Sequence, residues 1–301
     1  MNGASTDSDA PRLEGGRGAN DTVTVAFAQA GSELCGLARL GIAAPEEPGP
    51  PQASGLVVLF HEGRLVTVAA EGSIPCEAPS SWEEVRAAGL STGALSPGPG
   101  WSVDFGGAQE SFALELEALG EPGRVENPTP GREPDDGLGE DSLCRVRGSV
   151  QIADSVIDLD CLGQRVRSSQ ALDWRRVELT RQVSAWMDDG LAVSLTATRP
   201  DGARAHAEET VRALLVEGRP PTSSLVSEAR LSSTYDDAGR QRRASLELWP
   251  AEDSDFPRRV AGTVVCGTSL ELGRLRLECA FFRWWMEGRE GRGRYDVLRR
   301  A

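Results

Sequence analysis

Two arginines, an aspartate and a tryptophan lie close together in one segment and are the first candidates for chemistry. Arg165 and Arg167 stand in a strand-like run, and Asp173 and Trp174 follow after a polar turn. A guanidinium can hold a substrate oxygen, and a nearby carboxylate can fix the orientation of that guanidinium. We therefore expect a catalytic pair in which Arg165 binds a substrate oxygen and Asp173 orients Arg165.

Aromatic side chains could supply an apolar pocket beside this pair. The chain has seven tryptophans, and several of them fall in strand-like stretches of the C-terminal half. Inside a β-barrel such side chains either fill the core or line a ligand cavity. We expect Trp174, Trp186, Phe282 and Trp284 to line a pocket, with core packing as the alternative for each of them.

The lysine, histidine, cysteine and glycine patterns of other kinds of active site are absent or weak in this sequence. All 32 basic residues are arginines, which excludes Schiff-base and other lysine-based chemistry. The only histidines are His61, beside a turn, and His206, which lies next to two glutamates and is the better acid–base candidate. The six cysteines form no CxxC pair, and the glycine-rich segments do not open a helix after a strand. We expect no metal and no cofactor.

The charge balance limits the partners. The formal net charge is -14, which repels phosphate backbones and anionic lipid surfaces, so nucleic acid and membranes are not expected. No apolar run approaches the roughly 20 residues that span a bilayer. Residues 1–20 resemble neither a signal peptide nor an anchor, and we interpret them as a disordered tail of a cytoplasmic protein.

Most of the chain has the pattern of short antiparallel strands. Residues 55–71 read as a hairpin around Glu62 and Gly63, and residues 111–119 alternate, with Phe112, Leu114 and Leu116 on one face. Residues 80–89 are the best helix candidate, since Ser80 or Ser81 can cap them and Gly89 can end them.

Composition divides the chain in two. Residues 121–141 hold almost no large apolar side chain and are interpreted as a linker or long loop. This gives an N-terminal β domain over residues 21–120 and a C-terminal β-barrel domain over residues 142–301. We expect an all-β protein of two antiparallel β-barrel or sandwich halves packed together.

The turn residues of the C-terminal half predict three hairpins and the residues that pair in them. A turn near Ala153 and Asp154 predicts a hairpin there. A turn at Asp189 and Gly190 predicts a second hairpin that places Trp186 near Val193. A third turn centred on residues 272 and 273 would bring Cys266 and Cys279 face to face, where they could form a disulfide.

The segment around Arg165 resembles a known family. A Gly-x-Arg turn opening the second half, with a tryptophan soon after and a glycine-spaced closing strand, is similar to the lipocalin-like hydroxyneurosporene synthase (carotenoid 1,2-hydratase) family and its AttH-like relatives. In that family the turn typically reads Gly-x-Arg-Asp-His-Ser-Trp-Gly. Gly163, Arg165 and Ser168 fit this pattern, whereas the aspartate position holds Val166. Arg167 and Ser169 replace the histidine and the tryptophan.

The resemblance implies a fold and an apolar pocket more than a reaction. Hydration of an alkene needs an acid, which Val166 cannot supply. Related lipocalin-like proteins include cyclases of polyketide and terpenoid pathways, in which holding a flexible substrate in a reactive conformation lowers the barrier. We expect a cofactor-independent cyclase, isomerase or lyase of specialised metabolism acting on an apolar isoprenoid- or polyketide-like molecule. A non-catalytic carrier of an apolar small molecule and a filled-barrel interaction module are the alternatives.

Overall fold

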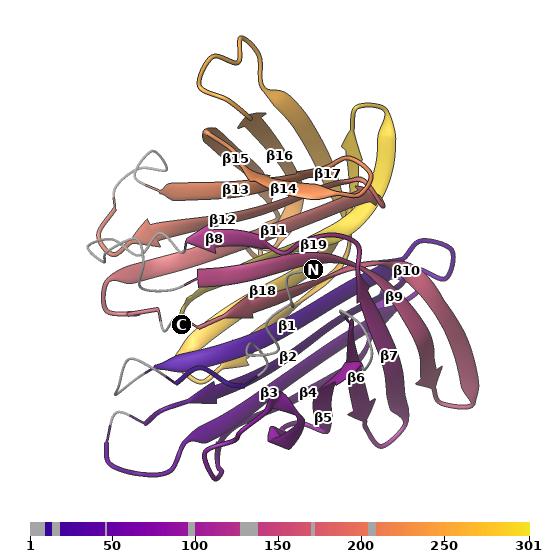
Figure 1. Cartoon of the computed structure of the whole chain (residues 1–301), viewed down its shortest axis with the longest axis vertical. Coiled ribbons are helices and arrows are strands. Elements are labelled where there is room, and N and C mark those ends of the chain that lie inside the picture. The colour runs from indigo at the N-terminus through magenta and orange to yellow at the C-terminus, as the bar shows by residue number, and fades with distance from the viewer. Residues whose placement is uncertain are drawn as a thin grey trace, which may run out of the picture.

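The computed structural model describes residues 10–13, 19–45, 47–95, 100–126, 138–169, 172–203 and 209–301. It is all-β, with two curled antiparallel sheets stacked one above the other, as Figure 1 shows. Each sheet curls around its own apolar core, so the expectation of two lipocalin-like halves is confirmed. Among the described residues, no helix has the length and apolar character that crossing a membrane would require.

The first sheet contains ten strands in the order β4-β3-β2-β1-β10-β9-β7-β6-β5, with β8 added beside β9. Its strands are β1 (Asn20–Gln29), β2 (Leu34–Ala43), β3 (Gln52–His61), β4 (Arg64–Pro75), β5 (Leu90–Leu95), β6 (Gly100–Gly106), β7 (Glu110–Ala118), β8 (Gly123–Glu126), β9 (Leu138–Ile152) and β10 (Ser155–Ser168).

The second sheet contains nine strands in the order β14-β13-β12-β11-β19-β18-β17-β16-β15. Its strands are β11 (Val177–Asp188), β12 (Leu191–Pro200), β13 (Thr210–Glu217), β14 (Thr222–Leu225), β15 (Glu228–Tyr235), β16 (Gln241–Trp249), β17 (Arg258–Leu272), β18 (Leu275–Met286) and β19 (Arg289–Arg300). If β8 is set aside, the two sheets have the same strand order, so the architecture repeats although the sequence shows no fixed-period repeat.

The boundary between the sheets differs from the predicted domain boundary. β9 and β10 belong to the first sheet, which therefore extends to Ser168, and the second sheet begins at Val177. The predicted linker, residues 121–141, contains β8 and the start of β9. Residues 123–126 and 138–141 pair with each other through their backbones, which a polar composition permits, whereas residues 127–137 of the predicted linker lie outside the described residues.

The first residues also depart from the expected disordered tail. The backbone N–H of Arg12 donates a hydrogen bond to Asp21 Oδ2 at 2.7 Å, and Leu13 packs against the core of the first sheet. Residues 10–13 therefore lie against the protein. Residues 1–9 and 14–18 fall outside the described residues.

The burial patterns explain why particular strands occupy particular places. β7 alternates buried and exposed side chains, with Phe112, Leu114 and Leu116 inward as predicted. β1 is buried along almost its whole length, because one face covers the first core and the other faces the second sheet. The predicted helix over residues 80–89 is a single 3₁₀ turn, Trp82–Glu84, capped by Ser81. Trp82 is buried, so core packing holds this segment.

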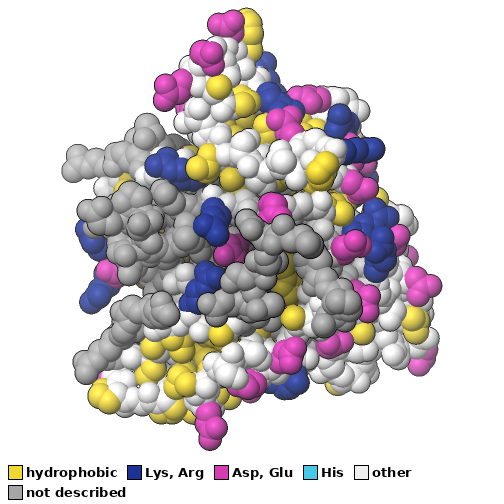
Figure 2. Space-filling view, viewed as in Figure 1, with side chains coloured by type: hydrophobic (Ala, Val, Ile, Leu, Met, Phe, Trp, Pro, Cys, Tyr) yellow, Lys and Arg dark blue, Asp and Glu magenta, His cyan; other side chains and the backbone are white. Residues whose placement is uncertain are grey.

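A third apolar cluster joins the two sheets. It combines Phe60 from β3 with Trp186 from β11 and Phe281 from β18, among other side chains of both sheets. The rings of Phe60 and Phe281 meet edge to face with centroids 6.0 Å apart. This cluster fixes how one sheet lies on the other. On the outer surface, Figure 2 shows acidic side chains spread over both halves, as the net charge of -14 requires.

Register decides which side chains share a face. Ile152 pairs with Ser155, so the predicted turn at Ala153 and Asp154 is confirmed. Trp186 pairs with Ala192, not with Val193, because the strand has an irregularity between Trp186 and Asp188.

The predicted pairing of two cysteines is also wrong. Cys279 pairs with Thr268, and Cys266 pairs with Phe281, because the turn lies one residue further along and β17 has an irregularity between Val264 and Cys266. All six cysteines are free thiols.

Candidate functional site

Arg165 and Arg167 point into the first half, not toward the second. They pair with Val25 and Val23 of β1, whose side chains belong to the first core. The guanidinium carbon of Arg165 lies 4.2 Å from the centre of the Trp101 ring, a cation–π contact across the interior of the half. The Arg165 side chain therefore lies inside the first half, where it contacts Trp101.

Arg167 has a structural partner. Its Nη2 lies 2.8 Å from Asp21 Oδ2, and both side chains are almost fully buried. The same nitrogen donates to the Ala10 carbonyl at 2.5 Å, and Asp21 also accepts from the backbone of Arg12. A buried pair with these additional bonds anchors the N-terminal segment across the first sheet.

Asp173 does not orient Arg165 in this structure. Its Oδ1 accepts hydrogen bonds from the backbone N–H of Arg175 at 3.0 Å and from Arg175 Nε at 3.1 Å. These bonds, led by the one from the backbone, lower the pKa of the Asp173 carboxyl. The carboxylate closes its own turn, and the half-buried Trp174 lies in that turn.

The aromatic residues expected to form one pocket lie in different parts of the molecule. Phe282 and Trp284 are stacked with ring centroids 5.1 Å apart in the interior of the second half. A Cβ atom at Gly262, the cross-strand partner of Trp284, would overlap the indole ring. Trp186 instead belongs to the cluster between the sheets. The structure does not bring these side chains together with Trp174 or Arg165, so their role in ligand binding stays a prediction.

A recess between the two sheets combines apolar and charged side chains. The larger inter-sheet cavity encloses about 90 Å³, and the recess measures about 770 Å³ when its solvent-filled mouth is included. Its aliphatic wall comes from both sheets, and its charged groups include Arg39, Arg294 and Asp296. The lining residues are Thr22, Thr24, Leu37, Arg39, Leu56, Val166, Ser168, Leu172, Thr180, Gln182, Leu277, Arg294, Asp296 and Leu298.

A second space adjoins it. The smaller inter-sheet cavity, of about 50 Å³, shares Val166, Ser168, Gln182 and Arg294 with the larger one. Its other lining residues are Gly139, Asp141, Val183, Ser184, Ser194, Leu195 and Thr196. The two spaces therefore form one continuous polar and apolar surface between the sheets.

Arg294 and Asp296 form the charged part of this surface. Arg294 Nη1 lies 2.9 Å from Asp296 Oδ2, and Arg294 Nη2 donates to Gln182 Oε1 at 3.4 Å. Burial raises the pKa of the Asp296 carboxyl, and the charge of Arg294 acts in the opposite direction. The guanidinium is thus oriented by two partners while it faces both cavities.

Asp141 supplies a second carboxyl to this surface. Gln164 Nε2 donates to both of its oxygens, at 2.6 and 2.5 Å. The same nitrogen lies 3.2 Å from Ser194 Oγ, and the Ser184 hydroxyl donates to Gln164 Oε1. Burial raises the pKa of Asp141, whereas the bonds from Ser194 and Gln164 and the charge of Arg294 lower it.

Sequence reasoning missed these residues. Asp141 stands in a polar segment that was interpreted as a linker, and Arg294 stands in a glycine-spaced strand without a distinctive motif. A usable sign was present at Gln164, Val166 and Ser168, which alternate with the two arginines and must therefore occupy the opposite face of that strand.

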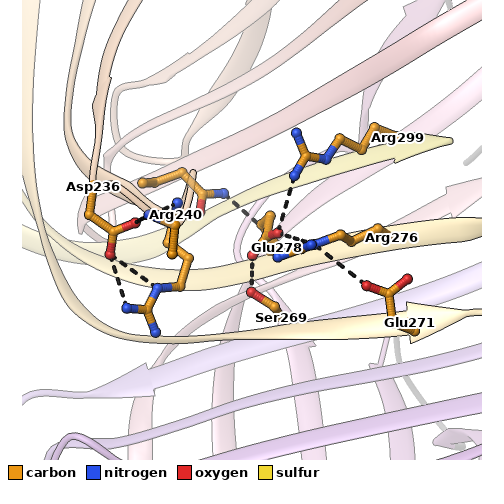
Figure 3. A network of polar contacts seen from close by, with 9 residues as sticks. Asp236, Arg240, Ser269, Glu271, Arg276, Glu278 and Arg299 are labelled. Atoms are coloured by element: carbon orange, nitrogen blue, oxygen red, sulfur yellow. Dashed lines mark hydrogen bonds and ion pairs between the residues drawn. The ribbon is translucent and has the colours of Figure 1, made fainter. Parts of the chain in front are cut away.

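A further polar cluster surrounds Glu278 in the second half (Figure 3). The buried Glu278 carboxylate accepts from Ser269 and from Arg276 Nε at 2.6 Å, and Arg299 lies 3.7 Å away. Nearby, Asp236 is paired with Arg240. Glu278 and Asp236 are each ion-paired with an arginine, and neither lines the recess between the sheets, so we interpret this group as a structural cluster.

Comparison with known proteins places the chain in a family of unestablished function. Residues 7–301 match the sequence model of a protein family, DUF7064, which is described as a domain of unknown function. No curated protein matches the sequence significantly.

Solved structures share the fold at low sequence identity. A protein from Nitrosomonas europaea, assigned as AttH by similarity, has a TM-score of 0.66 at 12% identity, covering 96% of this chain and 98% of that one. CghA, solved with Sch210972, has a TM-score of 0.65 at 10% identity, covering 94% and 89%. Kievitone hydratase from Nectria haematococca has a TM-score of 0.58 at 8% identity, also covering 94% and 89%. The fold expected from the resemblance to the AttH-like, lipocalin-like family is confirmed.

Proposed function

Since the chain belongs to the DUF7064 family, whose function is unknown, its activity has to be inferred from its own site. We propose that it is a cofactor-independent enzyme of specialised metabolism, a cyclase or isomerase, that binds an apolar isoprenoid- or polyketide-like substrate between its two sheets. The observation that carries this proposal is the recess between the sheets, which joins a leucine-rich wall to the oriented Arg294.

The size and chemistry of the recess support such a substrate. The enclosed part of the recess, about 90 Å³, is smaller than a pocket that surrounds a whole ligand, so it would hold one end of a molecule while the rest lies in the open mouth. Leu37, Leu56, Leu277 and Leu298 offer contact to a hydrocarbon, and Arg294 offers donors to an oxygen. A mainly apolar substrate with one polar end would place its hydrocarbon part against the leucines and its polar end at Arg294.

The interiors of the two halves are less suited to a ligand. Large side chains such as Phe27 in the first core and Trp284 in the second are fully buried and packed against their neighbours. A space found in the first interior, between β1, β2, β5 and β6, measures about 10 Å³. We therefore move the proposed site from the barrel interiors to the space between them.

The structural relatives favour the same class of activity. One of them is named kievitone hydratase, and another, CghA, was solved with the small molecule Sch210972. At 8% and 10% identity these neighbours share the fold alone, so they show that this fold can carry a hydratase and bind a small molecule, without specifying a reaction for this chain.

The test begins with the protein purified from its own host. Native mass spectrometry should detect a bound small molecule, and organic extraction should identify it as a mainly apolar compound with a polar end. Incubating the protein with that compound and its unsaturated precursors should then give an isomerised or cyclised product. Recovery of the compound unchanged would make the protein a carrier, and a ligand-free protein that binds no polyene or polyketide would refute the proposal.

A further inference from the structure

Asp141, which the sequence places in a polar segment, lies on a strand and has its carboxyl group between the two sheets. It lies on β9 where that strand faces the second sheet, and it lines the smaller inter-sheet cavity together with Val166, Gln182 and Ser194. Asp141 and Val166 are direct cross-strand partners, so their side chains share the face that looks toward the second sheet. The carboxyl therefore belongs to the proposed substrate surface.

The carboxyl is held by a chain of hydrogen bonds that reaches across both sheets. Gln164 of β10 donates to both Asp141 oxygens, and its own carbonyl accepts from Ser184 of β11. Ser194 of β12 approaches the same amide nitrogen at 3.2 Å. Since Ser184 occupies the amide oxygen, the amide nitrogen is directed at Asp141. Side chains from three other strands thus fix the one carboxyl group on β9, an arrangement that suits a group whose position matters.

The surroundings of Asp141 are otherwise almost uncharged. The residues that face it from β10, β11 and β12 are Val166, Gln182, Ser184 and Ser194, and its partner on β8 is Gly123. Arg294 of β19 lines the same cavity, and its charge lowers the pKa of Asp141. Burial favours the protonated form of this carboxyl, whereas its hydrogen bonds and the charge of Arg294 favour the ionised form, so both forms of the group are accessible to it.

We propose that Asp141 is the proton-transferring residue of the inter-sheet site and acts on an apolar unsaturated ketone whose oxygen faces Arg294. This inference rests on the proposed function and names its substrate class. Asp296, the other carboxyl of the surface, is less suited because it is ion-paired with Arg294 at 2.9 Å.

The proposed step is balanced without an external reagent. The Asp141 carboxylate removes a proton from the carbon between the carbonyl and the double bond. The C–H electron pair becomes a new carbon–carbon π bond, and the carbonyl π pair moves onto the oxygen beside Arg294. Asp141 then returns the proton to the far carbon of the dienolate, which re-forms the carbonyl and the carboxylate and moves the double bond into conjugation.

This assignment also bears on the family resemblance. The position that holds an aspartate in the similar turn is Val166 in this chain, and Asp141 is the residue directly across from it on the neighbouring strand. A carboxyl is thus present on the same face, one strand away.

The test measures binding and proton transfer separately. Geranylacetone, an apolar isoprenoid ketone whose nearest double bond lies too far from the carbonyl to form the dienolate, is incubated with the protein in D₂O and reports only the first half of the step, the removal of a proton next to the carbonyl. Quenching of tryptophan fluorescence reports binding, and mass spectrometry reports deuterium uptake next to the carbonyl. We expect Asp141→Asn to bind geranylacetone as the wild type does, but to exchange deuterium at least about 100-fold more slowly. Asp158→Asn, which changes an exposed carboxylate on β10, should match the wild type.

Each outcome separates the two proposals. Binding with equal exchange in the wild type and Asp141→Asn, or with no exchange at all, would overturn the role of Asp141 and leave a binding site. Absence of binding would overturn the proposed function itself. If Asp141→Asn melts far below the wild type, Asp141→Glu, which keeps the acid, is the deciding variant. Asp141→Glu must exchange deuterium faster than Asp141→Gln, which has the same length but no acid, for Asp141 to keep its assigned role in proton transfer.

Discussion

Trp186 and Trp284 lie beside adjacent residues of β19 but on opposite faces of the second sheet. Trp186 pairs with Arg292 and packs between the sheets, whereas Trp284 pairs with Gly291 and packs inside the second half. Both are almost fully buried. A single pocket cannot include both indole rings, and each ring has a separate role in holding the structure together.

Replacing Trp284 by alanine should destabilise the protein strongly. The change removes the stacking on Phe282 and leaves a cavity above Gly262, so we expect a loss of about 3–5 kcal/mol in the free energy of unfolding. Urea denaturation followed by circular dichroism measures it. The matched control is Trp285→Ala, because its neighbouring indole is 38% exposed and should matter much less. Equal losses in the two variants would show that Trp284 is not a core residue.

The buried pair of Asp21 and Arg167 predicts a second stability effect. Replacing Asp21 by asparagine leaves the guanidinium of Arg167 with a weaker partner in a buried place, and we expect a loss on the order of 3–5 kcal/mol. The comparison variant is Asp173→Asn, which breaks an exposed pair with Arg175 and should leave the unfolding midpoint unchanged. If the Asp21 variant unfolds at the wild-type midpoint, the pair has no structural importance.

Asp141 should make stability depend on pH in a particular direction. Because burial raises its pKa, the folded state binds the proton more tightly than the unfolded state does. That stabilisation is present at low pH and is lost as the pH rises through the folded pKa. Asp141→Asn cannot titrate, so its melting temperature relative to the wild type should increase as the pH rises. A difference that stays constant, or that falls with pH, would contradict the raised pKa.

The cysteines should differ in reactivity. Cys35 and Cys266 contact each other in the cluster between the sheets, and this contact, together with burial, raises the pKa of Cys35. Burial also raises the pKa of Cys144 to about 12. Cys76 is less buried than these. We expect iodoacetamide to modify Cys76 first in the folded protein, and the buried thiols only after unfolding. Peptide mapping that finds Cys35 modified as fast as Cys76 would show that the sheets separate readily.

The sequence was sufficient to predict the fold class because alternation and turn residues are local. The burial of Phe112, Leu114 and Leu116 and the turn at Ala153 follow directly from such patterns. The site was harder to predict because it depends on two sheets meeting. Nothing near Asp141 in the sequence indicates that Ser184 and Ser194 lie opposite it. A one-residue shift also moves a side chain to the other face, as the pairing of Trp186 with Ala192 illustrates.

The central claim is that a small molecule binds between the sheets, and filling that space tests it most directly. Val166 lines both inter-sheet cavities, so Val166→Trp should fill them, whereas Val156→Trp adds the same bulk at a 66% exposed position of the same strand. Native mass spectrometry of both variants, purified from the host alongside the wild type, is the decisive measurement. We predict that Val156→Trp retains the small molecule and that a folded Val166→Trp protein has lost it. Retention of the molecule by Val166→Trp would place the binding site elsewhere and contradict the account.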